Sequence, residues 1–240
     1  MKILSKVGVL AFAVVSLGGC ANRASRPQPL PGHEAEVSYA LRPCPDGLER
    51  FLPGEYYFCD AARDYWAGNM GRAVQILGYS AEWANKPAQY ALGVMYFNGD
   101  RIPMNRPLGI AWLAIAAERH DPQYEAVFVS AYKSATAEER KQANAYWRNM
   151  RPVYSDKVAA VRAIKRYNRA MSPIYDLAST GGGSIYISGL TPGSSGLALE
   201  RLLRKGRDEA LGDVDGTVTV GEMPMVTLGS LVGPASDQAR

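Results

Sequence analysis

The chain has 240 residues, of which 47% are hydrophobic and 21% are charged. This composition is ordinary for a packed globular protein and excludes a wholly disordered chain, and the lack of a Gly-X-Y period excludes a collagen-like one. A total of 27 Lys and Arg against 23 Asp and Glu leaves a net charge of +4, too small a bias to indicate nucleic-acid binding. With two histidines and three cysteines, a zinc site is not expected, and we predict neither a metal nor a cofactor.

The first 19 residues have the features of an export signal. Lys2 and Lys6 form a positively charged start, and small residues close the segment. The apolar stretch 7–17 is shorter than the roughly 20 residues that a transmembrane helix needs. We therefore predict a signal peptide over residues 1–19.

The four residues that end at Cys20, Leu-Gly-Gly-Cys, resemble the bacterial lipobox. This resemblance implies a lipoprotein in which Cys20 receives a diacylglyceryl group, carries fatty acids such as palmitate and becomes the mature N-terminus. Ala21 stands where lipoproteins retained in the inner membrane often have Asp, so the resemblance favours an outer-membrane anchor and a periplasm-facing protein. The alternative is an ordinary secretory signal with an incidental cysteine.

Two further features follow the signal. Residues 20–38 contain three prolines and few large apolar side chains, so we expect an extended tether rather than a core. Cys44 and Cys59 come next, and an exported chain meets an oxidising compartment, which favours a disulfide between them. The loop-entropy argument gives such a bridge a stabilisation of about 3 kcal/mol. The alternative is two free, buried thiols.

Residues 39–171 are predicted to form a helical repeat domain, because Ala, Tyr, Trp and Leu recur there at helical spacing. Thr136 and Glu139 fit a capping box at the start of one helix. The expected helices are 59–67, 70–84, 88–97, 107–119, 122–133, 136–150 and 155–171.

One segment carries a family resemblance. Ala-Leu-Gly-Val-Met-Tyr-Phe-Asn-Gly at 91–99, followed by Ala-Trp-Leu-Ala-Ile-Ala-Ala at 111–117, resembles the Sel1-like repeat, a relative of the tetratricopeptide repeat. The copy at 88–120 matches well, whereas those at 55–87 and 122–150 are degenerate. The resemblance implies a mainly α fold, a short α-solenoid of antiparallel helix pairs that binds protein or peptide partners. The inner-helix candidates for partner contact are Gln89, Tyr90, Tyr124 and Phe128.

Residues 172–240 differ in character, and we expect a small, Gly-rich α/β appendage that is partly flexible. No aromatic residue occurs from 187 to 240, so this segment has little with which to build its own core. A helix is expected at 196–211. Two short β runs at 218–221 and 226–229 either pair as a hairpin, dock on the solenoid or await a partner strand.

Two motifs invite a catalytic or metal-binding interpretation, and the first of them invites two. Asp213-Val-Asp215-Gly is similar to the nucleophile motif of haloacid dehalogenase-type phosphatases, but too few residues follow it to supply the partner groups. On an EF-hand frame the first calcium ligand falls on Leu211, which cannot coordinate. Ser130-x-x-Lys133 has the spacing of penicillin-recognising enzymes, but no Lys-Thr/Ser-Gly triad accompanies it. We therefore predict no catalytic residues and no enzyme.

Basic residues concentrate between positions 140 and 169. On the helix from 155, an inner stripe is expected at Val158, Val161 and Ile164. The outer side is expected to carry Arg162, Arg166 and Arg169. This arrangement is either a solvated helix face or a patch for an acidic protein, peptidoglycan peptides or anionic lipid.

These features together predict a membrane-anchored periplasmic adaptor that binds a protein or peptide and no nucleic acid. Two alternatives stay open. One is a peptidoglycan- or β-lactam-interacting envelope enzyme, and the other is an assembly factor for a secretion or pilus complex.

Overall fold

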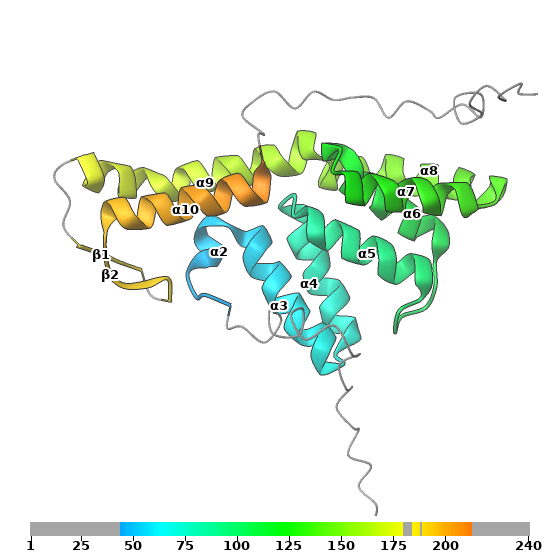
Figure 1. The fold of residues 1–240 in the computed structure, drawn as a ribbon, viewed down its shortest axis with the longest axis horizontal. Helices are drawn as coiled ribbons and strands as arrows, with labels where there is room; N and C mark the ends of the chain where they lie inside the picture. Colours follow the sequence, from blue (N-terminus) through cyan, green and yellow to red (C-terminus); the bar gives the residue numbers. More distant parts are fainter. Residues whose placement is uncertain (1–43, 180–183, 188, 213–240) are drawn as a thin grey trace, which may run out of the picture.

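The computed structural model describes residues 44–179, 184–187 and 189–212. Over these residues the chain is mainly α-helical, as predicted, with one two-stranded sheet (Figure 1). In chain order the elements are α2 (Leu48–Phe51), α3 (Pro53–Ala67), α4 (Met70–Glu82), α5 (Lys86–Asn98), α6 (Arg106–Ala116), the 3-10 helix η1 (Ala117–Arg119), α7 (Pro122–Ser134), α8 (Ala137–Tyr154), α9 (Asp156–Ser179), β1 (Ser184–Ile187), β2 (Thr191–Ser195) and α10 (Gly196–Leu211).

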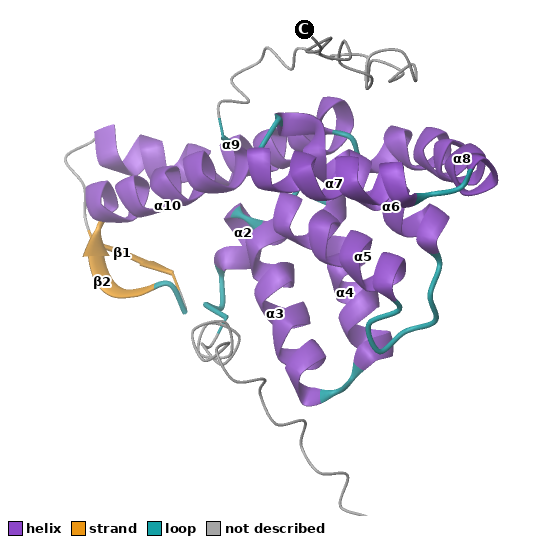
Figure 2. Cartoon of the chain, turned by 45° about the vertical axis from the view of Figure 1, so that its right-hand side comes forward, coloured by secondary structure: helices purple, strands orange, loops and turns teal. Residues whose placement is uncertain are grey.

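Helices α3 to α6 pack as successive neighbours, and short turns with clear sequence signals separate them (Figure 2). Gly68, with a φ of 86°, ends α3 in the left-handed region that glycine tolerates. Asn85 starts α5 and Asn105 starts α6, because each side-chain oxygen accepts a hydrogen bond from the amide three residues later, at 2.8 and 3.1 Å. The predicted capping box of Thr136 and Glu139 is present at the start of α8.

The pair α5 and α6 approaches closely through two glycines. A Cβ added to Gly93 would lie 2.7 Å from Cγ of Leu113, and one added to Gly109 would lie 2.5 Å from the backbone nitrogen of Phe97. Neither position has room for a side chain, so these glycines set the distance between the two helices.

The main hydrophobic core lies among α3, α4, α5, α6 and α8. Trp112 of α6 belongs to this core and contacts α8. Its ring packs edge-on against the ring of Tyr154, with the centroids 4.7 Å apart. Leu92 and Ile115, almost fully buried, fill the space between α5 and α6. One continuous cluster therefore joins α3, α4, α5, α6 and α8, whereas α7 packs in a separate cluster.

A second hydrophobic cluster joins α2, α9 and α10. Tyr167 and Met171 of α9 are fully buried against Leu199 and Leu203 of α10, with Phe51 of α2 beside them. Helix α10 lies at the predicted position 196–211, and it shares this core with α9 and with α2 from the first half of the chain. The predicted domain boundary at residue 171 lies inside α9, which continues to Ser179.

The face that α9 buries differs from the predicted one. Val158 and Val161 are 37% and 38% exposed, whereas Ala159, Ala160 and Ala163 are buried. The predicted inward stripe is therefore wrong for Val158 and Val161, whereas Ile164 packs against the buried alanines as expected. Alanine allows the backbone of α9 to approach Trp83 and its neighbours closely, and this contact decides the rotation of the helix.

The strands β1 and β2 form an antiparallel hairpin between α9 and α10, with Ser184 opposite Ser195 and Ile187 opposite Thr191. This hairpin is not among the elements predicted from the sequence. The strands predicted at 218–221 and 226–229 lie outside the described residues.

Candidate functional site

A cleft of about 960 Å³ separates α10 from the helix pairs. One wall is formed by α3, α5, η1 and the start of α7, and the opposite wall by α10 and the turn at Leu190. Its volume lies in the range of natural ligand sites. The side chains that define its character are Glu55, Pro87, Arg119 and Tyr124 on the first wall and Leu202, Lys205 and Glu209 on the second.

The base of this cleft contains a buried ionic network. Lys86 is 4% exposed, and its Nζ lies 2.7 Å from the carbonyl oxygen of Ile115, 3.1 Å from Asp156 and 3.2 Å from Glu118. Burial would raise the pKa of Asp156, but the charges of Lys86 and Arg119 outweigh it and lower that pKa overall. Burial raises the pKa of Glu118 despite the nearby Lys86. Because these groups pair with one another, the network links α5, η1 and the start of α9.

Glu55 is the acidic group on the α3 wall of the cleft. Its Oε1 accepts a hydrogen bond of 2.6 Å from Nδ2 of Asn85, the residue that caps α5. Burial raises the pKa of Glu55, and this effect outweighs the hydrogen bond from Asn85. The sequence analysis does not single out Glu55, because its environment is made by residues 30 or more positions away.

The four predicted contact residues occupy different places. Tyr124 lines the cleft, and its ring stacks on that of Tyr90 with centroids 4.9 Å apart. Phe128 packs against Tyr132 within the cluster between α6 and α7. Gln89 is fully buried, and its Nε2 donates to the carbonyl oxygens of Ala81 and Tyr154 at 3.1 and 3.0 Å. The prediction that Gln89 faces a partner is therefore wrong, because this side chain satisfies two backbone carbonyls inside the fold.

The basic residues predicted on α9 border a second, separate depression of about 760 Å³, which we call the basic groove. Its walls come from α9 and from Arg50 and Trp83, at the ends of α2 and α4. The α9 residues that line it are Lys157, Val158, Val161, Arg162, Lys165, Arg166, Arg169 and Ala170. The two valines that the sequence assigned to the core thus lie in the groove among the basic side chains.

Arg162 and Arg166 are half-buried and held in place by backbone carbonyls. Nη2 of Arg162 donates to Glu82 and, at 2.9 Å, to Val153, and Nη2 of Arg166 donates to Glu49 at 3.1 Å. Both guanidinium carbons lie over the ring of Trp83, at 5.6 and 5.3 Å. These two arginines therefore connect α9 to α2 and α4, a role that their position on one helix face did not reveal.

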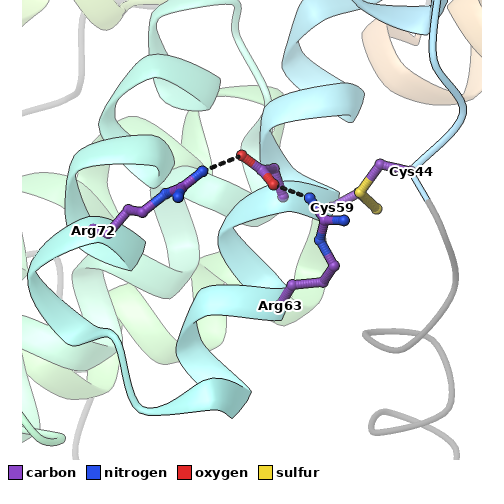
Figure 3. Close-up of a disulfide and its surroundings, with 5 residues drawn as sticks. Cys44, Cys59, Arg63 and Arg72 are labelled. Atoms are coloured by element: carbon purple, nitrogen blue, oxygen red, sulfur yellow. Dashed lines mark hydrogen bonds and ion pairs between the residues drawn. A yellow bond between two sulfur atoms is a disulfide. The ribbon is translucent and has the colours of Figure 1, made fainter.

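The two cysteines predicted to pair are joined in the structure. Cys44 and Cys59 form a disulfide with their Cα atoms 5.8 Å apart, which ties the first described residue to α3 (Figure 3). Asp60, next to Cys59, pairs with Arg63 and Arg72 on the adjacent surface. The predicted lipidation residue, Cys20, lies outside the described residues.

The remaining sequence motifs bring no reactive groups together in the described part of the chain. Ser130 and Lys133 lie on the exposed side of α7, close to its C-terminal end. The Asp213 and Asp215 motif lies outside the described residues. Among the residues that the structure describes, no group of three His, Cys, Asp or Glu is arranged to hold a metal ion. None of the described helices is both long and apolar enough to span a lipid bilayer.

Comparison with known proteins provides no family assignment. No family model matches the chain, and neither a curated protein nor a solved structure matches it.

Proposed function

We propose that the protein is a non-enzymatic adaptor of the bacterial envelope that binds an extended peptide segment of a partner protein. In this proposal α3 to α8 form a short Sel1-like α-solenoid. The β1–β2 hairpin and α10 form an appendage that completes the binding cleft.

The cleft between α10 and the helix pairs is the observation that carries this proposal. It combines half-exposed apolar and aromatic surface, at Leu202 and Tyr124, with charged groups of both signs, at Glu55, Lys205 and Glu209. Such a mixture suits a peptide, whose side chains vary along its length, better than a single small metabolite. The network around Lys86 supports the proposal further, since it makes the base of the cleft rigid and reduces the entropy lost on binding.

The proposed location rests on the lipobox resemblance at Cys20. An acyl chain on this cysteine would hold the protein at the outer membrane, with the described helices on the periplasmic side. Replacing the nucleophilic thiol, as Cys20→Ser, should release the protein from sedimented membranes into the soluble periplasmic fraction. Continued sedimentation of the variant with membranes would contradict the proposed anchor.

Site-specific photocrosslinking in intact cells tests the cleft. A photoreactive residue at Leu202, which is 52% exposed and lines the cleft, should give a crosslinked partner peptide that mass spectrometry can sequence. Leu197 provides a matched control, because it lies on the same helix, is 56% exposed and does not line the cleft. Equal crosslinking at both positions, or none at Leu202, would contradict the proposal.

A synthetic peptide with the sequence of the crosslinked segment provides the second step. It should bind the purified chain, and Tyr124→Ala should weaken binding by about tenfold, since an aromatic contact in a partly enclosed site commonly contributes 1–2 kcal/mol. Val129→Ala is a suitable control, because Val129 is on the same helix and exposed but does not line the cleft.

A further inference from the structure

The basic groove has a charge that its own surroundings do not neutralise. Six of its lining residues are Lys or Arg, and among the described residues that line it there is no Asp or Glu. The elements around it also carry Glu49, Glu82 and Asp156, which do not line it; Glu49 accepts a hydrogen bond from Tyr57, and Asp156 pairs with Lys86 and Arg119. Four of the six cationic side chains are exposed at the surface: Arg50, Lys157, Lys165 and Arg169.

The groove is also shaped in advance. Nη2 of Arg162 donates to the backbone carbonyls of Glu82 and Val153, and Nη2 of Arg166 donates to that of Glu49. These guanidinium groups are therefore held in place and lose little conformational freedom when an anion binds. Nε of Arg166 is buried and has no hydrogen-bond partner among the described residues. Since guanidinium donors bind carboxylates through two parallel hydrogen bonds, these groups suit the carboxylates of an acidic peptide.

An apolar strip accompanies these charges. Val158 and Val161 are each more than a third exposed, beside the ring of Trp83. From Lys157 to Arg169 the helix rises by 12 residue steps, or about 18 Å, the length of five or six residues of an extended peptide. We infer that the basic groove binds an acidic peptide segment of a partner protein, with carboxylates on the arginines and lysines and apolar side chains on the two valines.

This inference goes beyond the proposed function because the basic groove lies on α9, which contributes no lining residue to the cleft. The groove residues Val158, Val161, Lys165 and Arg169 recur every three or four positions and share one side of the helix. The opposite side, with Tyr167 and Met171, is buried against α10, which forms a wall of the cleft. The two sites can therefore be occupied together and can fail independently.

A peptide fits these observations better than a bilayer surface does. The guanidinium groups of Arg162 and Arg166 lie half-buried in a depression with Trp83 behind them, whereas binding to a flat layer of headgroups requires charges that protrude. The apolar strip is narrow and bordered by charges on the same helix, as an amphipathic peptide requires.

Fluorescence anisotropy with a labelled decapeptide of alternating Glu and Leu tests the inference on the full chain carrying Cys20→Ser. The reverse-charge variant Lys165→Glu/Arg169→Glu should weaken binding by about tenfold or more, and added salt should weaken binding by the wild-type groove. The control Lys141→Glu/Arg148→Glu makes the same charge change at exposed positions of α8 and should change binding less than about twofold. Equal losses in the two variants would overturn the inference, since binding would then follow net charge alone.

Two other arms identify different occupants. Vesicles of phosphatidylglycerol and phosphatidylethanolamine that bind the wild type but not Lys165→Glu/Arg169→Glu, while the peptide does not bind, would overturn the inference in favour of lipid. The chain's own residues 213–240 contain the acids Asp213, Asp215, Glu222 and Asp237 against one base, Arg240. If truncation after Gly212 increases peptide affinity about tenfold or more, the groove's occupant is this segment, and the inference is overturned.

Discussion

The guanidinium of Arg119 lies against the carboxylate of Asp156, with Nε 2.8 Å from Oδ2 and Nη2 3.1 Å from Oδ1. The same arginine donates to the carbonyl oxygens of Ala84 and Ala210, at 3.0 and 2.8 Å. It thus joins the end of α4, the start of α9 and the end of α10. Lys86, 3.1 Å from Asp156, is the second cation on this carboxylate. Because Lys86 and Asp156 are both buried, neither charge can be solvated by water if its partner is lost.

Asp156→Asn should therefore destabilise the protein strongly. The substitution preserves shape but leaves Lys86 and Arg119 without their shared anion, and removing one partner of a buried pair commonly costs about 3–5 kcal/mol. Urea unfolding at neutral pH, followed by circular dichroism, measures the change. Glu138→Gln removes an acidic charge from an exposed position on α8 and should cost less than about 0.5 kcal/mol. A similar loss of unfolding free energy in the two variants would show that the buried network does not stabilise the fold.

Glu55 should make the stability of the protein depend on pH in a direction opposite to that of ordinary acid denaturation. Burial raises the pKa of Glu55 above its usual value, so the folded state holds this proton more tightly than the unfolded state does. Its contribution to stability is complete below the unfolded pKa and is lost as pH rises through the higher folded pKa. Glu55→Gln keeps an acceptor for Asn85 and never ionises.

The free energy of unfolding of Glu55→Gln, relative to wild type, should therefore increase as the pH rises from the ordinary pKa of a glutamate through the higher pKa of Glu55 in the folded state. Denaturant titrations at several pH values measure this difference. Glu138→Gln, at an exposed position of α8, is the control and should change the free energy of unfolding by less than about 0.5 kcal/mol across the same range. A flat profile for Glu55→Gln itself would show that Glu55 is not desolvated.

The helices could be predicted from sequence because their signals are local. Pro122 and Thr136 stand at the starts of helices predicted from 122 and 136, and Gly99 ends α5 in the left-handed conformation. These signals act over three or four residues, so their reading requires no knowledge of the remote chain. The same holds for the helix at 196–211, whose apolar face is visible in its spacing.

The two depressions could not be predicted, because they depend on which helices meet. Leu203 belongs to an apolar side of α10 that the helical spacing reveals. Nothing in the local sequence indicates that Phe51 and Tyr167 cover this side. The sequence of α5 suggests that Gln89 is a surface residue, yet it is fully buried and donates to the carbonyl oxygen of Tyr154, 65 residues away. The sequence shows the basic residues of α9 as a cluster. It gives no sign that Trp83, at the end of α4, lines the same groove.

The Cys44–Cys59 disulfide should stabilise the fold by restricting the unfolded chain. The cysteines are 15 residues apart, and loop-closure entropy gives a bridge of this size about 3 kcal/mol. Reducing agent should therefore lower the free energy of unfolding by about this amount in the wild type. The double variant Cys44→Ala/Cys59→Ala should have the lowered value from the start and should not respond to the reducing agent. A response of the double variant equal to that of the wild type would mean that the effect does not arise from this bridge.

The contact between α5 and α6 should not tolerate even one additional methyl group. A Cβ at Gly109 would lie 2.5 Å from the nitrogen of Phe97 and 2.8 Å from the carbonyl oxygen of Gly93, and both are backbone atoms that side-chain rotation cannot move away. Gly109→Ala should therefore force the helices apart and cost about 1–3 kcal/mol, despite the better helix propensity of alanine.

Gly78, within α4, provides the matched comparison. A Cβ there meets no atom within 4 Å, so Gly78→Ala should gain about 0.5–1 kcal/mol from reduced freedom of the unfolded chain. Thermal and urea unfolding of the two variants should thus give shifts of opposite sign for the same chemical change. If both variants are stabilised, α5 and α6 do not approach as closely as these glycines indicate, because a relaxed contact would leave only the propensity of alanine to be measured.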